Sequence, residues 1–215
     1  MVTARRGADR LAIAVFVRAP AAGAAKTRLI PALGAAGAAR LQRRLAVHAL
    51  GVAQRAAIGP VVIWAAPDAE HRFFRAVQRH CAVGLRAQVG ADLGERMAAA
   101  FAAQAGPLLL IGSDCPALQP AHLAVAARNL LDDGGKDAVF IPAEDGGYVL
   151  VGLRHPQPSL FQRVEWGSGS VMAQTRQRLA GLGLRWAELP RLWDVDRPED
   201  LARLATLEGF AEWCR

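Results

Sequence analysis

Short apolar runs alternate with longer stretches of helical periodicity along almost the whole chain, and this alternation constrains the fold more than any other feature. The runs that predict strands are 11–17, 60–66, 83–89, 107–112, 137–142, 147–153 and 184–189. The stretches that predict helices are about 35–57, 68–80, 94–105, 120–132, 170–181 and 198–208. Strands that alternate with helices predict a mainly parallel sheet, because parallel neighbours need long crossover connections. We therefore expect an α/β protein with three layers, α/β/α.

The connection between the runs 137–142 and 147–153 departs from this pattern. Only four residues, AEDG at 143–146, separate the two runs, which is too few for a crossover. The sheet is therefore expected to be mixed, with either one antiparallel strand or a bent extension formed by this pair. Because no internal repeat or break in composition divides the 215 residues, we expect one domain over 1–215, with residues 1–10 disordered.

The composition argues against a membrane protein and against a metal or disulfide framework built on cysteine. Although 53% of the residues are hydrophobic, no run approaches the roughly 18 uninterrupted apolar residues of a membrane span. The first apolar run stops at Arg18 without a cleavage-like site, so it predicts a buried strand rather than a signal peptide. Cys81, Cys115 and Cys214 are far apart and odd in number. We expect a cytoplasmic protein with reduced thiols and no membrane span.

The net charge of +7 and the pI near 10.5 raise the possibility of a nucleic-acid partner. The arginines, however, are spread over the whole chain, and no basic block with interleaved aromatic residues is present. We therefore expect no nucleic-acid partner. Two explanations of the charge remain: a GC-rich coding sequence, which favours Ala, Gly and Arg, or attraction for an anionic, phosphorylated small molecule.

Polar and glycine-rich segments follow four of the predicted strands. They are Arg18 with 23–28 after the first strand, 92–96 after the third, 113–116 after the fourth and 144–147 after the fifth. Ligands of open α/β sheets bind beyond the carboxyl ends of the strands. The sequence therefore predicts a binding site at this edge of the sheet.

The loop after the first strand carries three cations, Arg18, Lys26 and Arg28, with Thr27 between the last two. Cationic side chains neutralise phosphate oxygens, so these four residues are candidates for substrate binding. The loop is not a Walker P-loop, because Ala25 rather than a glycine precedes the lysine. The alternative is a solvated basic loop.

Acidic residues at the ends of predicted strands are candidates for a metal site. Asp114 stands where the fourth strand ends, and magnesium prefers one or two carboxylates together with substrate phosphates and water. The alternative is that Asp114 caps the turn that follows. In the segment WDVDRPEDL, Asp194 and Asp196 share one side of an extended chain, so either could supply a second carboxylate. Asp200 fits an ordinary helix start.

The segment PAEDGGYVLVGL combines two acids and two glycines in a tight connection. One interpretation is a hairpin-type turn, for which Asp-Gly is a strong signal. The other is an acceptor site, in which Asp145 binds or deprotonates the acceptor. The neighbours Glu144, Gly146 and Gly147 would then contact the ligand. Both interpretations stay open on the sequence alone.

Five segments, read in order, resemble a bacterial family of small proteins similar to nucleotide-diphospho-sugar transferases. They are FVRAPAAGAAKTRL, DLGERM, IGSDCP, PAEDGGYVLVGL and WDVDRPEDL. The family has carried the label of a domain of unknown function, and many members are named as arsenosugar-biosynthesis-type glycosyltransferases. A more distant resemblance links the chain to phospholactate and molybdopterin-cofactor guanylyltransferases. Two signatures are absent: the G-G-x-G-T-R-M motif of sugar-nucleotide pyrophosphorylases and a D-x-D doublet after the fourth strand.

The resemblance implies a glycosyltransferase-A-like fold, a mostly parallel mixed sheet with one antiparallel strand. It also implies roles for individual residues. Asp114 would bind a divalent ion, Mg²⁺ or Mn²⁺, with Asp196 favoured over Asp194 as the second ligand. The phosphates would face the basic loop, Asp92, Gly94 and Arg96 would lie near the base or sugar, and Asp114, Asp145 and Lys26 would be the catalytic residues.

The leading hypothesis is a metal-dependent glycosyltransferase that uses a nucleotide-activated sugar and a small-molecule acceptor. The first rival is a nucleotidyltransferase that joins a nucleoside monophosphate from a triphosphate to a phosphorylated metabolite. The second is a non-catalytic nucleotide-binding protein. The sequence leaves the donor base, the sugar, the acceptor and a homodimer open.

Overall fold

The computed structural model describes residues 10–132 and 134–211, which form seven strands and six α-helices with two short 3₁₀ helices. The strands are β1 (Ala12–Arg18), β2 (Val61–Ala66), β3 (Gly84–Ala87), β4 (Leu108–Gly112), β5 (Ala138–Pro142), β6 (Tyr148–Leu153) and β7 (Trp186–Glu188). The helices are η2 (Thr27–Leu29), α1 (Ile30–Ala56), α2 (Arg72–His80), α3 (Leu93–Ala102), α4 (Pro120–Leu131), η3 (Pro158–Phe161), α5 (Val171–Gly181) and α6 (Asp200–Leu204). Each predicted strand and helix is present. Two predictions fall outside the described residues: the disorder expected at 1–10, of which only Arg10 is described, and the reduced thiol of Cys214.

The seven strands form one sheet in the order β3-β2-β1-β4-β6-β5-β7. All pairs are parallel except those of β6, which runs antiparallel to both β4 and β5. The mixed sheet with one antiparallel strand is thus confirmed, and β6 is the strand that the four-residue connection reverses. Because β5 and β4 point the same way, the connection after β5 lies at the same edge as the ends of β1 and β4.

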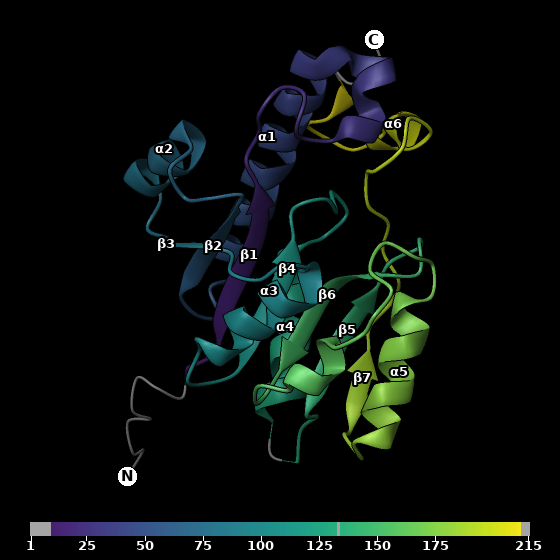
Figure 1. The fold of residues 1–215 in the computed structure, drawn as a ribbon. Coiled ribbons are helices and arrows are strands. Elements are labelled where there is room, and N and C mark those ends of the chain that lie inside the picture. Colours follow the sequence, from purple (N-terminus) through teal and green to yellow (C-terminus); the bar gives the residue numbers. More distant parts are fainter. Residues whose placement is uncertain (1–9, 133, 212–215) are drawn as a thin grey trace.

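Helices cover both faces of the sheet, so the three-layer prediction is confirmed (Figure 1). Alternate side chains of each strand point to opposite faces, which divides the core into two clusters. One cluster contains Ile13 and Val15 of β1 with residues of α1, α2 and α4. The other contains Ala14 and Phe16 with residues of α3, η3 and α5. The central strands are apolar on both faces because both faces are buried.

A third cluster joins the C-terminal segment to the N-terminal part of α1. It contains Leu41 and Leu45 of α1 with Trp193 and Val195 of the segment that follows β7. Figure 1 shows α6 beside α1 at the upper end of the molecule. This packing carries the chain after β7 across the carboxyl edge of the sheet.

Three predicted helix boundaries shift for local reasons. α1 begins earlier than expected, but Gly34 breaks it with a positive φ of 67°, so regular helix runs from residue 35. α2 begins at Arg72 because the side chain of His71 accepts a hydrogen bond from Phe73 N and caps it. α6 ends at Leu204, and successive turns follow it up to Phe210. Among the described residues, no helix is both long and apolar enough to cross a bilayer.

Candidate active site

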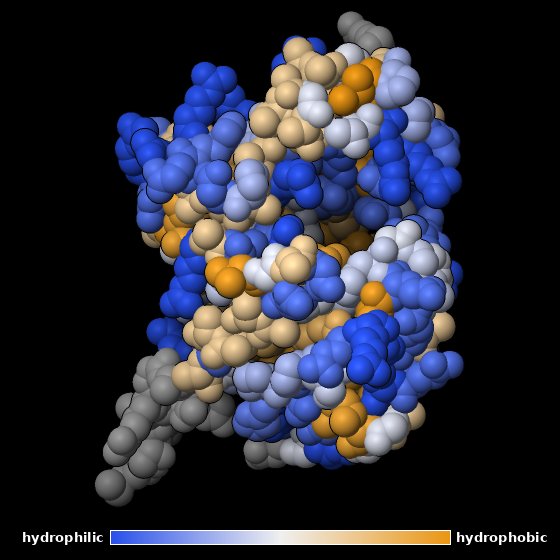
Figure 2. All heavy atoms as spheres, viewed as in Figure 1, coloured by the Kyte–Doolittle hydropathy of each residue, from blue (hydrophilic) through white to orange (hydrophobic). Residues whose placement is uncertain are grey.

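A cavity of about 660 Å³ opens at the carboxyl ends of β1 and β4. Figure 2 shows the surface hollowed between the part that contains α1 and α6 and the strands below, with many hydrophilic residues around the hollow. The polar residues that line this donor cavity, as we call it, are Arg18, Lys26, Thr27, Arg28, Gln42, Gln88, Arg96, Ser113, Asp114 and Asp196. Four guanidinium or ammonium groups therefore share one cavity with two carboxylates. Of the four polar segments predicted at this edge, those after β1 and β4 line this cavity, together with Arg96 from the segment after β3.

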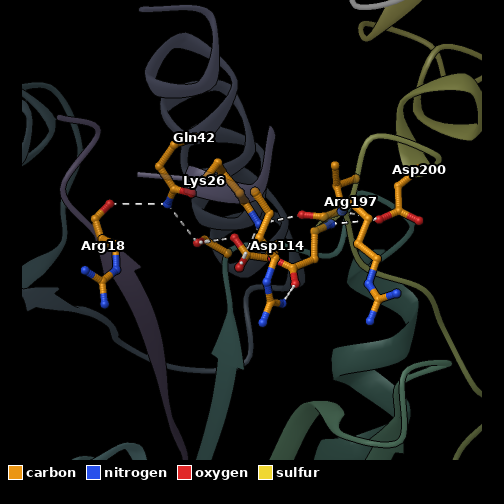
Figure 3. A network of polar contacts seen from close by, with 10 residues as sticks. Arg18, Lys26, Gln42, Asp114, Arg197 and Asp200 are labelled. Carbon is orange, nitrogen blue, oxygen red and sulfur yellow. Dashed lines mark hydrogen bonds and ion pairs between the residues drawn. The ribbon is translucent and has the colours of Figure 1, made fainter. Parts of the chain in front are cut away.

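Lys26 and Asp114 form an ion pair at the edge of the sheet. The Lys26 Nζ atom lies 2.9 Å from Asp114 Oδ2 and also donates a hydrogen bond to the Val195 carbonyl. The Lys26 side chain is 4% exposed, whereas that of Asp114 is 45% exposed and faces the cavity. Lys26 adopts a left-handed backbone conformation, with φ 48° and ψ 47°, which is uncommon outside glycine and concentrates at functional sites. Figure 3 shows the lysine directed at the aspartate.

Arg28 and Asp196 form a second ion pair at the side of the cavity. Both side chains are about half exposed, so solvent screens the pair and its contribution to stability is small. Arg18, at the end of β1, is exposed beside them; its carbonyl accepts a hydrogen bond from Gln42, and its guanidinium lines the cavity. The basic loop thus supplies three cations to one space, as the sequence predicts.

A second cavity of about 380 Å³ adjoins the first, because Arg28 and Asp196 line both. Acidic residues dominate this acidic cavity: Glu144, Asp145, Asp194, Asp196 and Asp200. Burial is the main cause that raises the pKa of Asp194 to about 6, and the negative charges of Asp145 and Asp114 contribute to this shift. Asp194 therefore lies within electrostatic reach of both other carboxylates.

Two sets of hydrogen bonds fix the segment that carries Asp194. Val195 N donates to the Asp114 carbonyl at 2.9 Å, which ties the segment to the end of β4. The carboxylate of Asp200 accepts hydrogen bonds from the backbone N–H groups of Asp196 and Arg197 (Figure 3). This structural role of Asp200 agrees with the helix-start prediction. Asp194 and Asp196 were expected to share one side of an extended chain, but they have different partners. Asp196 pairs with Arg28, whereas Asp194 lines the acidic cavity.

The connection after β5 is a tight turn that also reaches the acidic cavity. Asp145 Oδ1 accepts a hydrogen bond from Gly147 N at 2.9 Å, and Gly146 has a positive φ of 94°. A side chain at Gly146 would collide with the Gly169 backbone, so this glycine permits close packing. Glu144 makes a two-point contact with Arg203, which lowers the pKa of Glu144. Turn geometry thus explains the glycines, while Asp145 and Glu144 also line a cavity.

Of the predicted residues after β3, only Arg96 lines the donor cavity. Asp92 caps α3 through a hydrogen bond from Glu95 N, and Gly94 lets α3 pack against Phe161 and Trp166. Both line a separate cavity of about 450 Å³. The structure therefore gives Asp92 and Gly94 clear structural roles and separates them from the other candidates.

The donor groups fit a metal ion that arrives with a phosphate ligand better than an ion caged by protein alone. Within the described ranges, no group of three or more His, Cys, Asp or Glu side chains is close enough to hold an ion. Magnesium needs only one or two carboxylates when phosphates and water complete its shell. Asp114 faces the donor cavity, and the carboxylate of Asp194 lies within electrostatic reach of Asp114 and of Lys26.

Two polar residues of the donor cavity, Gln42 and Gln88, were not among the sequence-based candidates. Gln42 is a buried amide on α1 that hydrogen-bonds to Arg18 and Ser113, and Gln88 donates from its side chain to the Trp64 carbonyl. One signal for Gln42 existed: it interrupts an apolar helix face formed by Ala38, Leu41, Leu45 and Ala49. The burial of Cys115 raises the pKa of its thiol to about 12, so a nucleophilic role is disfavoured.

Comparisons with known proteins agree with the resemblance found in the sequence. Residues 49–168 match the family described as "Uncharacterized protein conserved in bacteria (DUF2064)". The crystal structure of a candidate nucleotide-diphospho-sugar transferase from Desulfovibrio desulfuricans G20 is 29% identical, covers 94% of this chain and 90% of that chain, and superposes with a TM-score of 0.81. No curated protein matches the sequence.

Two more distant structures share the fold. A 4-diphosphocytidyl-2C-methyl-D-erythritol synthase from Anaerococcus prevotii is 11% identical, covers 97% of this chain and all of its own, and has a TM-score of 0.61. The Mycobacterium tuberculosis protein Rv0371c in complex with manganese is 17% identical, covers 91% of this chain and 97% of its own, and has a TM-score of 0.53. The expected fold class is thereby confirmed.

Proposed function

Since the chain belongs to the bacterial family DUF2064 and has the nucleotide-diphospho-sugar transferase fold, we propose that it is a metal-dependent transferase that moves a sugar from a nucleotide donor to a small acceptor. One observation carries the proposal: a basic cavity that holds the Lys26–Asp114 pair adjoins a cavity lined mainly by acidic side chains. The first suits a diphosphate and the second suits the hydroxyl groups of a sugar or acceptor.

The lining of the donor cavity supports a bound nucleotide. Phe16, Leu93 and Ala66 supply apolar surface, and Gln88 and Arg96 supply polar groups, as a base and ribose require. Lys26, Arg28 and Arg18 supply positive charge beside Asp114, where the phosphates would lie. A nucleotide would then lie across the carboxyl ends of β2, β1 and β4, which is where ligands of open sheets bind.

Asp114 and, in our proposal, Asp194 would hold the divalent ion. We favour Asp194 over Asp196 because Asp194 lies within electrostatic reach of Asp114 and Asp145, whereas Asp196 pairs with Arg28 at the side of the cavity. When bound, the ion would stabilise negative charge on the departing nucleotide. Manganese in the distant Mycobacterium tuberculosis structure supports a metal in this fold, and magnesium fits the same donor groups.

The side chains of the protein would stabilise the charge of the leaving group and hold the acceptor in position. Lys26 and Arg28 would neutralise the phosphate oxygens of the leaving group, and such charges lower the barrier where negative charge develops. Asp145, on the turn after β5, would orient the acceptor hydroxyl or accept its proton. The loss of one such group typically costs a factor of about 100 or more in rate.

Nucleotidyl transfer is the second candidate, because several distant relatives of the fold are cytidylyltransferases. Its acceptor would be a phosphorylated metabolite. The acidic cavity disfavours a phosphorylated acceptor, since Asp145 and Asp194 would repel it. A neutral, hydroxylated acceptor meets no such repulsion, and this difference favours sugar transfer.

A thermal-shift screen with nucleotide sugars and nucleoside triphosphates, each with and without Mg²⁺ or Mn²⁺, tests the proposal. A ligand at about 100 times its Kd adds about 2.7 kcal/mol to the stability of the folded state, which is easily measured. We expect a sugar nucleotide to stabilise the wild type only with metal. Asp114→Ala should abolish this shift, and Asp132→Ala, at an exposed position at the end of α4, should not.

Product analysis separates the candidates. Release of a nucleoside phosphate from the sugar nucleotide supports sugar transfer. Release of pyrophosphate from a triphosphate supports nucleotidyl transfer. If neither class of ligand stabilises the protein in the presence of metal, the proposed function is wrong.

A further inference from the structure

A buried chain of hydrogen bonds leads from helix α1 to Asp114. Gln42 Nε2 lies 3.2 Å from the Arg18 carbonyl oxygen and 3.2 Å from Ser113 Oγ. Ser113 Oγ in turn lies 3.1 Å from Asp114 Oδ1 (Figure 3). The chain therefore joins the end of β1, the end of β4 and one oxygen of the Asp114 carboxylate.

The two residues that relay the contact are unusual in this protein. Gln42 is 3% exposed and Ser113 is 5% exposed. Among residues 10–132 and 134–211, the only other polar residue that is buried as a whole is Thr175, which bonds within its own helix. Burial of a polar group costs free energy unless the group is hydrogen-bonded. The bonds of Gln42 and Ser113 meet this requirement, and they also hold the ends of β1 and β4 in fixed positions relative to α1.

The chemistry of the end groups fixes the direction of every bond in the chain. A backbone carbonyl only accepts, so the amide of Gln42 must turn its NH₂ group toward Arg18, and the same nitrogen donates to Ser113. An ionised carboxylate also only accepts, so the one hydroxyl hydrogen of Ser113 goes to Asp114 Oδ1. Lys26 binds the other oxygen, Oδ2. The carboxylate is thus held from both sides.

We propose that Gln42 is a positioning residue that acts through Ser113 to aim the carboxylate of Asp114 into the donor cavity. The inference rests on the proposed function, since the aimed carboxylate is the one assigned to the divalent ion. Groups that orient a metal ligand from behind typically change metal affinity by 10–100-fold when they are removed. Gln42 touches no reacting atom in this scheme.

The test uses three variants of the hydrogen-bond chain from Gln42 through Ser113 to Asp114. Two of them remove a link of the chain, and the third replaces the donor at position 42 by an acceptor. Gln42→Met keeps the length of the side chain without its hydrogen bonds, and Ser113→Ala removes the hydroxyl. Gln42→Glu has the same shape but cannot donate to Ser113. Gln54→Met is the matched control, because Gln54 is an exposed glutamine on the same helix.

Two measurements are made on the full chain. The first is the Mn²⁺ affinity, from the relaxation of water protons, with and without a nucleotide. We expect a loss of about tenfold in Gln42→Met and in Ser113→Ala, and no loss in the control. The double variant should lose no more than either single one, because both act through one relay. A purely structural role predicts instead that losses in melting temperature add up while the affinity for Mn²⁺ persists.

The second measurement is the crystal structure of each variant without metal. We expect one conformer of the Asp114 carboxylate in the wild type and a rotated or doubled one in Ser113→Ala and Gln42→Met. If the wild type binds no Mn²⁺ but the carboxylate turns in the variants, the positioning role stands and the proposed function falls. If the carboxylate keeps its orientation in Ser113→Ala and Gln42→Met, the inference is overturned, whatever the metal affinity.

Discussion

Asp194 illustrates how its surroundings, rather than its motif, determine the properties of a single residue. In the sequence it is one of two equivalent acids in WDVD. In the structure, burial and the charges of Asp145 and Asp114 raise its pKa to about 6, while Asp196 two residues later pairs with Arg28. A half-buried carboxylate held near two other carboxylates costs stability, and the charge of Lys26 offsets only part of this cost.

Removal of this charge should stabilise the metal-free protein and impair the site. Asp194→Asn keeps the shape of the side chain and relieves the repulsion, so we expect the free energy of unfolding to rise by about 1 kcal/mol at pH 7. The same variant should weaken metal-dependent binding of the nucleotide ligand. Urea unfolding and the ligand-induced thermal shift measure the two effects. A loss of stability would contradict the account of Asp194.

Gly94 supports a separate prediction, about packing. A Cβ atom at this position would lie 2.4 Å from the Phe161 carbonyl oxygen and 2.7 Å from Trp166 Nε1. Gly94→Ala should therefore destabilise the protein by about 2 kcal/mol, as overpacking typically does. Gly181→Ala is the control, since nothing lies within 4 Å of that Cβ position at the end of α5. The control should be neutral or slightly stabilising in the same denaturant titration.

The sequence predicts which residues meet in the donor cavity for the segments after β1 and β4, and misses a residue on a helix. Arg18, Lys26, Arg28 and Asp114 all stand after apolar runs, and the structure brings them into one cavity. Gln42 lies in the middle of α1, so no strand end, glycine or proline beside it marks a loop. Asp92 and Gly94 carry the expected loop chemistry but use it to cap and pack α3. A loop motif alone does not tell a cap from a ligand site.

At the scale of elements, α5 is joined to the edge strand β7 by charge as well as by packing. Arg176 of α5 donates two hydrogen bonds to Glu188 of β7, and Trp186 Nε1 donates to the same carboxylate. The hydrogen bonds from Arg176 are the main cause that lowers the pKa of Glu188. Because β7 has only three residues, this contact matters for the edge of the sheet.

The lowered pKa of Glu188 predicts a pH dependence with a definite sign. A carboxyl group whose pKa is lower in the folded state stabilises the protein above its unfolded-state pKa and loses this contribution as the pH falls. Glu188→Gln should therefore cost about 1 kcal/mol at pH 7 and progressively less below about pH 4.5. Urea titrations at several pH values measure this difference. A gap between variant and wild type that stays constant down to pH 3 would contradict the assignment.

The kinds and sequence of the elements could be predicted, but their order in the sheet could not. Apolar periodicity reports on each segment by itself, which is why all seven strands were predicted. The four-residue link between β5 and β6 also excluded a parallel pair. The insertion of β6 between β4 and β5 depends on long-range contacts such as those of Gly152 with Leu109 and Val139, which no local pattern reports.

At the scale of the molecule, the net charge is +7, and the donor cavity is likewise lined by more cationic than acidic side chains. Lys26, Arg28, Arg18 and Arg96 line one space, while the acids gather in the cavity beside it. An anionic ligand is therefore attracted by the whole chain and then by the cavity. Compositional bias alone does not explain why cations outnumber carboxylates in the donor cavity while acids outnumber cations in the acidic cavity beside it.

Ligand binding should accordingly weaken with salt. An increase in NaCl from about 0.05 M to about 0.5 M should raise the Kd of a nucleoside diphosphate about tenfold, because mobile ions screen the cavity. Arg18→Ala should flatten the slope of log Kd against log salt. Arg128→Ala, on the exposed side of α4, should leave the slope unchanged. Isothermal titration at four salt concentrations gives the slopes, and equal slopes in all three proteins would refute the local origin of the effect.

The reversed strand β6 has a consequence for how rigidly the acceptor side is built. A crossover between parallel strands starts at the carboxyl edge of the sheet and ends at the opposite edge. The loops after β1 and β4 are therefore each anchored by one strand on one side and by one helix on the other. The turn at 143–147 instead leaves one central strand and enters its neighbour at the same edge, and the Ala143–Leu192 bridge adds a third attachment. Asp145 thus stands on a short span clamped at both ends, whereas Lys26 stands on a longer loop. Between the two cavities, the acceptor side should be the stationary wall, and adjustment to different ligands should come from the basic loop.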